Sequence, residues 1–254
     1  MDILSLKEFL DEKVAMYNQP KFIETDPIQM VHAYSVKEDQ EIAGFLTATI
    51  AWGNRKMILK SAHQLMLHLG NSPYDFVMNY QKTQIEQLPL VIHRTFQQTD
   101  LHYFLLGLQH IYQNHGGLEA IIAKHRNGNN LHDAIHYLKT FFLEMNVPVR
   151  VHKHLSDPWK GSASKRLHMY FRWMSRKDQA GVDLGIWKSI PMSELSCPLD
   201  VHSGNVARKL GLLQRKQNDH KAVLELDNFL RRLDANDPAK YDFALFGLGV
   251  FEGF

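Results

Sequence analysis

A lysine and an aspartate 35 positions apart are the residues of this sequence best suited to chemistry: Lys165, which ends Gly161-Ser-Ala-Ser-Lys165, and Asp200 in Cys197-Pro-Leu-Asp200-Val-His202. Each is expected where a short loop leads into a helix. A lysine is nucleophilic only when its amine is neutral, a form favoured by the cationic neighbour Arg166 and by the positive end of a helix. A nearby carboxylate relays protons or stabilises a cationic sugar. The pair therefore suits cleavage of an N-glycosidic bond through a Schiff base.

Simpler interpretations exist for both residues. Lys165 also fits a surface lysine or one that contacts phosphate, and Asp200 also fits a helix cap. The charge pattern leaves a similar choice. Net charge is only +2, but basic residues outnumber acidic ones between Lys153 and Arg232. This stretch is either a set of solvated helix faces or a surface that follows phosphates.

Composition narrows the classes of protein. The chain has 254 residues, of which 44% are hydrophobic, enough to build the core of one large domain or of two small lobes. Its single cysteine, Cys197, excludes a disulfide framework and a Cys-rich metal site and favours the reducing cytoplasm. Metal-site, dinucleotide, nucleoside-triphosphate and esterase motifs are missing, so we expect neither metal nor cofactor. We expect no signal peptide and no membrane span.

The hydrophobic pattern is helical almost throughout, which predicts an all-α fold. No pair of alternating strands around a tight turn is found, and Ser175–Ser196 has the composition of an irregular loop. Apolar spacing and capping residues predict helices over Leu4–Tyr17, Glu41–Trp52, Ile58–Leu69, Leu101–Gln113, Gly117–His125, Asn130–Met145, Ser162–Met174, Val201–Leu210, His220–Leu233 and Pro238–Leu248.

The motif residues resemble a known superfamily. Gly161-Ser-Ala-Ser-Lys165, a helix, and then Pro198-Leu-Asp200-Val-His202 look like the helix–hairpin–helix (HhH-GPD) DNA glycosylases, in particular the 8-oxoguanine-type branch. The chain departs from their pattern at Ala163, where members usually have glycine, and in the longer Ser175–Ser196 stretch. Through Lys240-Tyr-Asp-Phe-Ala-Leu-Phe-Gly-Leu-Gly249 it resembles more closely an uncharacterised bacterial family, DUF2400.

The resemblance implies roles for residues across the chain. Lys165 is the implied nucleophile and Asp200 its carboxylate, while Asn54 and Arg55 are the candidates to fill the gap left by a flipped base. Trp52 is a further candidate, although a tryptophan that ends an apolar helix usually packs in a core. In the implied base pocket, Phe246 stacks on the base and Asp242 accepts hydrogen bonds from a guanine-type edge; core packing explains Phe246 equally well. The implied DNA contacts are Gly161, Ser162, Ser164, Arg166, His202, Asn54 and Arg55.

We therefore expect a two-lobed, all-α HhH-GPD-like protein, with one lobe at residues 30–145 and the other at residues 146–254 plus 1–29. The expected function is base-excision repair by a DNA glycosylase with AP lyase activity. The expected partner is damaged or abasic double-stranded DNA, bound by a monomer in the bacterial cytoplasm at the nucleoid. The alternatives are a non-catalytic DNA- or RNA-binding protein of the same fold and, more remotely, a helical protein-interaction scaffold.

Overall fold

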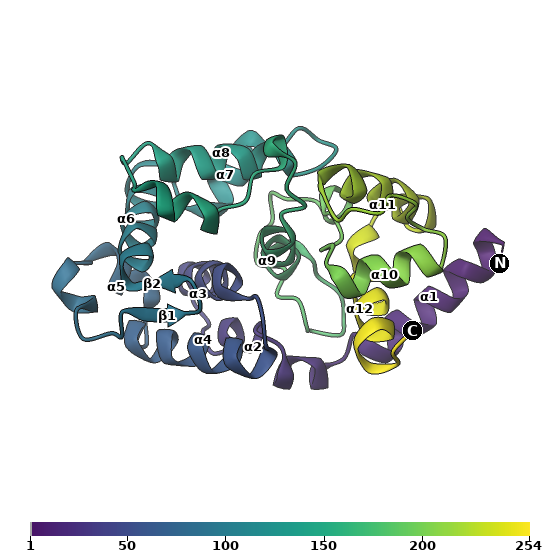
Figure 1. Ribbon diagram of the computed structural model, residues 1–254, viewed down its shortest axis with the longest axis horizontal. Coiled ribbons are helices and arrows are strands. Elements are labelled where there is room, and N and C mark those ends of the chain that lie inside the picture. The colour runs from purple at the N-terminus through teal and green to yellow at the C-terminus, as the bar shows by residue number, and fades with distance from the viewer. Residues whose placement is uncertain (1) are drawn as a thin grey trace.

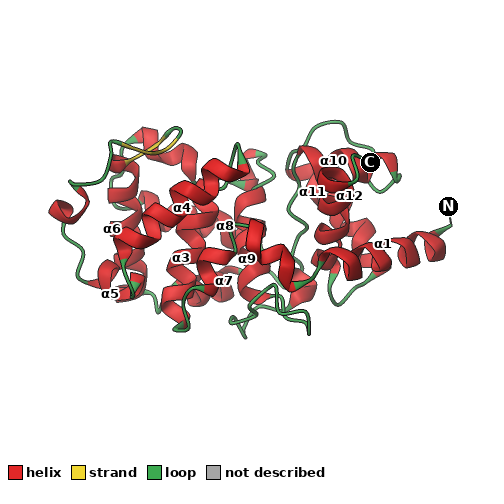
Figure 2. Cartoon of the chain, turned by 90° about the horizontal axis from the view of Figure 1, so that it is seen from below, coloured by secondary structure: helices red, strands yellow, loops and turns green. Residues whose placement is uncertain are grey.

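The computed structural model describes residues 2–254, and the all-α expectation is confirmed (Figures 1 and 2). Helices form two lobes, with α9 between them in the view of Figure 1. The helix α9 (Lys165–Ser175) packs with the larger lobe. The other helices of this lobe are α2 (Gln29–His32), α3 (Lys37–Ile50), α4 (Arg55–Leu69), α5 (Pro73–Met78), α6 (Gln98–Asn114), α7 (Leu118–His125) and α8 (His132–Leu143). The smaller lobe contains α1 (Ile3–Tyr17), α10 (Val201–Lys209), α11 (His220–Leu233) and α12 (Tyr241–Phe251).

Short elements connect these helices. A small antiparallel hairpin of β1 (Val91–His93) and β2 (Phe96–Gln97) lies against α4. The expectation that no hairpin exists is therefore wrong. The pattern missed it because the strands are too short to show alternation. The 3-10 turns are η1 (Pro20–Thr25), η2 (Lys82–Ile85), η3 (Val149–His154), η4 (Pro158–Lys160), η5 (Met192–Glu194) and η6 (Pro238–Lys240).

Each lobe has its own hydrophobic core. The larger core runs from Ile28 to Leu195 and also takes in Ala239 and Phe243. The smaller core joins α1 to the residues from Cys197 to Leu248. The predicted lobe boundary at residue 146 differs from this division, because α9 is buried around nearly its whole circumference and packs on α3 of the larger lobe. The chain crosses between the lobes near Ser196 instead.

α9 is fixed closely against the larger lobe. Gly44 on α3 allows this approach, since a Cβ there would lie only 3.0 Å from Cε of Met174 and 3.1 Å from the Tyr170 ring. The Tyr170 hydroxyl donates to the carbonyl of Glu41 over 3.1 Å. α9 therefore holds its first residues, Lys165 and Arg166, at a fixed place between the lobes.

The stretch Ser175–Ser196 is irregular, as predicted, and it folds back on the larger lobe. Val182 and Trp187 are buried, and the Trp187 indole donates to the Glu41 carboxylate over 2.6 Å. The backbone N–H of Trp187 donates to the carbonyl of Met174 over 2.9 Å. The loop is thus a second layer around the end of α9. Among residues 2–254 no helix is both long and apolar enough to cross a membrane.

Candidate active site

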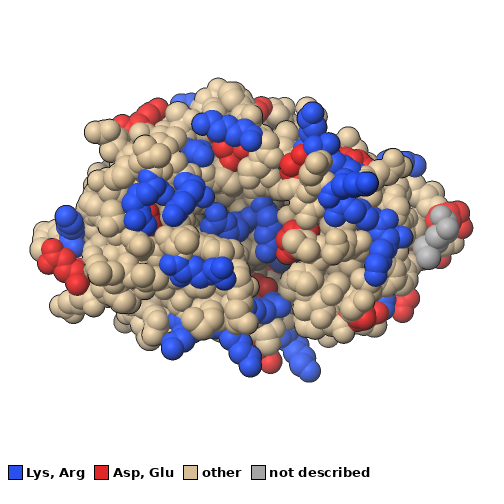
Figure 3. Space-filling model, in the orientation of Figure 1, with Lys and Arg blue, Asp and Glu red and all other residues tan. Residues whose placement is uncertain are grey.

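A cavity of about 570 Å³ opens between the two lobes, and most of the predicted functional residues line it. Figure 3 shows lysine and arginine side chains gathered around a hollow in the middle of this face. The lining comes from η1 and the loop after it, the α3–α4 loop, one face of α9, the start of α10, and α12. The predicted residues among it are Trp52, Arg55, Lys165, Arg166, Asp200, His202, Asp242 and Phe246.

Lys165 and Asp200 face each other at this cavity. Lys165 is the first residue of α9, and its Nζ lies 3.6 Å from Oδ2 of Asp200. Oδ1 of Asp200 instead caps α10, accepting the backbone N–H groups of His202 at 2.8 Å and Ser203 at 3.0 Å. The capping role and the role beside the lysine are therefore compatible, because each uses a different oxygen of the carboxylate.

Asp242 is buried at the inner wall of the cavity. Burial raises the pKa of its carboxyl to about 6, although the neighbouring Arg172 guanidinium acts in the opposite direction. Arg172 donates to Oδ2 of Asp242 and, over 3.2 Å, to Oδ1 of Asp183. The Sγ of Cys197 lies 4.0 Å from Oδ1 of Asp242. At the cavity wall the acceptor Asp242 and the donor Arg172 thus lie side by side and pair with each other through Oδ2 of Asp242.

Arg172 was not predicted to be a site residue, although its spacing from Lys165 indicates this position. It follows Lys165 by seven residues and Met169 by three, so all three lie on one face of α9 and line the cavity. A basic residue two helical turns after a candidate nucleophile is therefore placed on the same side of the helix. The Ser175–Ser196 loop contributes no lining residue, but it supplies Asp183, which holds Arg172 from behind.

The side walls are aromatic and cationic. Phe246 packs edge-on against Phe22 at 6.0 Å, and the Arg55 guanidinium lies 5.2 Å from the centre of its ring. Trp52 is half-buried and lines the same cavity, with the Arg166 guanidinium 4.9 Å from its ring. Phe246 and Trp52 are therefore cavity-wall residues, whereas Phe243 packs in the larger core.

Of the two residues predicted to fill the gap in DNA, Arg55 is bound to the protein itself, whereas Asn54 is exposed. Arg55 pairs with Asp26 at 2.8 Å and donates to the carbonyl of Thr25. The side-chain oxygen of Asn54 caps α4 by accepting the N–H of Met57 at 3.3 Å. Arg55 therefore forms part of the wall, and the exposed side of Asn54 is what remains for an outside contact.

Arg166 is also built into the interior. Its guanidinium donates to the carbonyls of Thr49 and, over 3.1 Å, His154. Burial lowers its pKa to about 10. These bonds join the start of α9 to the end of α3. Arg166 thus connects α9 to its neighbours at the cavity wall. Its contact with DNA stays a prediction.

The hairpin before α9 uses most of its own backbone donors. The N–H groups of Gly161, Ser162 and Ser164 donate to Pro158, Asp157 and the Ser162 hydroxyl, respectively. Gly161 and Ser164 both adopt left-handed backbone angles, with φ of 84° and 47°. No side chain caps α9, so the backbone N–H groups at Lys165 and Arg166 are the better-placed anion donors.

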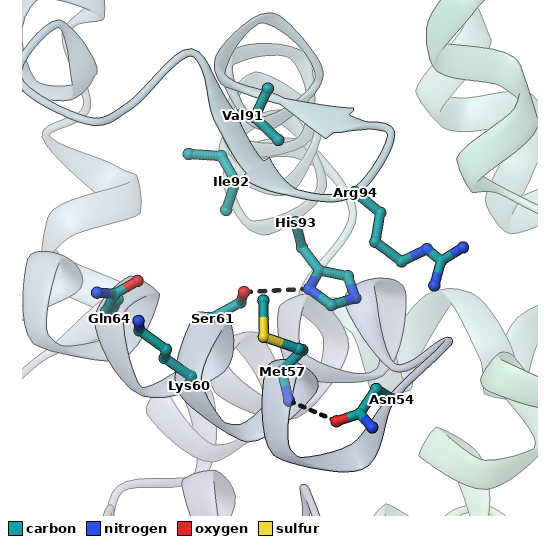
Figure 4. A pocket seen from close by; sticks show the side chains of 9 residues that line it. All are labelled: Asn54, Met57, Lys60, Ser61, Gln64, Val91, Ile92, His93 and Arg94. Atoms are coloured by element: carbon teal, nitrogen blue, oxygen red, sulfur yellow. Dashed lines mark hydrogen bonds between the residues drawn. The ribbon is translucent and has the colours of Figure 1, made fainter.

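Beside the cavity, the hairpin of β1 and β2 and the start of α4 enclose a basin of about 410 Å³ (Figure 4). Both ring nitrogens of His93 are occupied, by the Ser61 hydroxyl at 3.0 Å and the Trp52 carbonyl at 2.9 Å. His93 is therefore structural. Arg94 points away from the hairpin, and its side chain passes over Gly53 at the cavity rim.

Arg94 is a second residue that the sequence did not indicate. It is exposed and has φ of 52°, a left-handed conformation that a non-glycine residue rarely adopts. The missed hairpin places it there, so no pattern around Arg94 alone gives its position. Within residues 2–254, no group of three or more His, Cys, Asp or Glu is arranged to hold a metal ion.

Comparison with known proteins places the chain in one family. The model of the family described as "Protein of unknown function (DUF2400)" matches residues 26–251, and the chain belongs to that family. The resemblance to this family is confirmed, whereas the wider resemblance to the HhH-GPD superfamily stays a prediction. No curated protein and no solved structure matches the chain.

Proposed function

We propose that this DUF2400 family member excises a damaged base from DNA and cleaves the strand at the resulting abasic sugar. One observation carries the proposal: an amine and a carboxylate from distant segments, Lys165 and Asp200, lie 3.6 Å apart in a cavity of nucleotide size. The basic residues around that cavity favour a polyanionic substrate.

The chemistry starts from the ion pair. After Lys165 loses a proton to water, so that Asp200 stays ionised, its lone pair forms a bond to C1′ of the sugar. The C1′–N bond to the base breaks, and the bonding electrons leave with the base, which takes up a proton. The carboxylate stabilises the positive charge that develops on the sugar.

Strand cleavage follows from the same covalent link. Loss of the amine proton and opening of the sugar ring give a protonated Schiff base between Nζ of Lys165 and C1′. Removal of a C2′ proton then expels the 3′ phosphate by β-elimination, and water releases the lysine. Every step uses only the protein, the DNA and water.

The inner wall supports a guanine-type base. Asp242 accepts hydrogen bonds and Arg172 donates them, which matches an edge that carries N–H donors beside a carbonyl oxygen. Phe246 and Trp52 provide flat apolar surfaces on the walls. We therefore infer that the flipped base would lie against Asp242, with its sugar near Lys165.

Borohydride trapping tests the lysine directly. We expect a covalent adduct between the wild-type protein and an abasic duplex, and none with Lys165→Gln. Lys160→Gln is the matched control, because Lys160 is exposed on the same hairpin five residues earlier. Asp200→Asn keeps a good helix cap and removes the charge, so the adduct should form about 10²- to 10⁴-fold more slowly while α10 stays folded.

A non-catalytic nucleic-acid-binding protein is the second candidate. The ion pair with Asp200 favours it, because an ammonium group placed at the surface of a cavity is equally suited to contact a phosphate without any chemistry. If no duplex in a panel of oxidised, deaminated, alkylated and abasic sites gives an adduct, while binding to DNA remains dependent on salt, this second function is correct. Negligible binding to nucleic acid would exclude both.

A further inference from the structure

One tryptophan stands apart from the rest. Trp159 lies on η4 and is 57% exposed, whereas Trp173 and Trp187 are buried in the larger core. The cavity does not include it, and the excision chemistry gives it no role. Leaving a tryptophan exposed to water is energetically unfavourable, since burial stabilises a large apolar ring more than a small side chain.

The ring of Trp159 is held rigidly in spite of its exposure. Its indole N–H donates to Oδ1 of Asp133 over 2.9 Å, and one face stacks on the imidazole of His136 with a centroid distance of 3.7 Å and an interplanar angle of 10°. His136 is in turn bonded to Oδ1 of Asp157 at 3.1 Å. The same carboxylate oxygen accepts the backbone N–H of Trp159 at 3.1 Å.

These contacts fix both the position and the tilt of the ring. An edge and one face are occupied, so the exposed area belongs chiefly to the opposite face and the outer edge. A flat surface that is already oriented loses little conformational entropy when a second flat group stacks on it.

The place of this ring in the chain indicates its ligand. Trp159 precedes Gly161 by two residues, and the hairpin leads directly to the uncapped first turn of α9 at Lys165. Lys160, the next residue, is exposed. The six residues from Trp159 to Lys165 can span at most about 20 Å, so the ring lies within a few nucleotides of a phosphate bound at the start of α9.

We propose that Trp159 is a stacking platform for an unpaired nucleobase, so that the preferred substrate carries at least one unpaired nucleotide beside the target sugar. The proposal rests on the proposed function and names its substrate class: a single strand, gap or bubble rather than an intact duplex. Aromatic rings bind bases of any sequence in this way, because every base has a flat face.

Binding to three DNA probes of equal length tests the platform: an oligothymidylate single strand, a duplex with a two-nucleotide gap, and an intact duplex. Stacking of one base typically changes affinity by about 5- to 150-fold. Trp159→Ala should weaken binding to the single strand and the gapped duplex by a factor in this range and leave the intact duplex unchanged. His136→Ala, which removes the supporting ring and its hydrogen bond to Asp157 but keeps the Trp159 ring, should cause a smaller loss.

Two controls separate stacking from folding. Trp159→Phe keeps an aromatic face and should recover most of the affinity, and Leu67→Ala removes another exposed apolar side chain, on α4, and should change nothing. Single-stranded DNA should also quench the tryptophan fluorescence of the wild-type protein, and Trp159→Phe should lose most of that quenching, because only the half-buried Trp52 remains beside the cavity. This second readout remains valid even if Trp159→Ala does not fold.

The outcomes distinguish this inference from the proposed function. Equal affinity of wild type and Trp159→Ala for every probe overturns the platform and leaves lysine trapping untouched. An equal loss for the gapped and the intact duplex also overturns it, since unpaired bases would then not matter. If DNA does not bind and a protein partner requires Trp159, the ring belongs to a protein interface and both proposals are wrong.

Discussion

The carboxyl of Asp242 gives the sharpest prediction, because its pKa lies inside the range in which binding is easily measured. Burial raises that pKa from 3.8 to about 6, and Arg172 holds it from rising further. The group is therefore about 90% ionised at pH 7 and about 10% ionised at pH 5. Only the ionised form accepts two hydrogen bonds from a guanine-type edge without offering a competing donor.

The roughly ninefold fall in the ionised fraction of Asp242 between pH 7 and pH 5 sets the size of the effect. Affinity for a duplex with an oxidised guanine should fall about tenfold between pH 7 and pH 5, as the ionised fraction falls. Asp242→Asn should remove this dependence on pH. Arg172→Gln should move the midpoint upward, because the opposing cation is gone.

The assay uses the Lys165→Gln variant, so that binding is measured without excision. Its affinity for the oxidised-guanine duplex is divided by its affinity for an abasic duplex at each pH, which cancels titration of the remaining surface. Carboxyl carbon shifts in a 13C NMR titration give the midpoint of Asp242 itself. A midpoint near 4, or a ratio that stays constant from pH 5 to pH 7, would refute the assignment of Asp242 as the base reader.

Two further predictions concern stability. Burial raises the pKa of Asp227 to about 6, so the wild-type protein loses stability as pH rises from about 4 to 6. Asp227→Asn keeps an acceptor for the Cys197 N–H. In urea unfolding this variant should be up to about 3 kcal/mol more stable than the wild type at pH 8 and little more stable at pH 4. An equal gain at both pH values would contradict the burial argument. Gly247→Ala places a methyl group against the Tyr17 ring between α1 and α12 and should lower the free energy of unfolding by about 1–3 kcal/mol. If this overlap is the cause, adding Tyr17→Ala to the same chain should restore part of the loss.

The helices could be predicted because periodicity and capping agree. Asp200 and Asp219, for example, each accept N–H groups at the start of a predicted helix. α5 was not predicted, although Ser72 caps it and Pro73 stands in its first turn, a pattern typical of a helix start. A helix of six residues gives too short a pattern to be recognised by period alone.

The site could be predicted in part because its chemistry lies in short motifs. Lys165 is the first residue of α9 and Asp200 is the N-cap of α10, so the place of each residue at a helix start could be predicted from its motif. Their meeting could not be derived, since it depends on how α9 and α10 pack against different cores. The same limit applies to Arg55, whose partner Asp26 lies 29 positions away in sequence.

The Ser175–Ser196 loop now has a physical reason to lie between the two motifs. It stays out of the cavity, yet its Asp183 binds both Arg172 and, at 3.0 Å, Arg176, and so fixes the donor that meets Asp242. A buried arginine with only one carboxylate partner would leave donors unsatisfied, and the second carboxylate prevents this. The departure from the glycosylase pattern in length is therefore the part of the chain that holds the inner wall of the cavity in place.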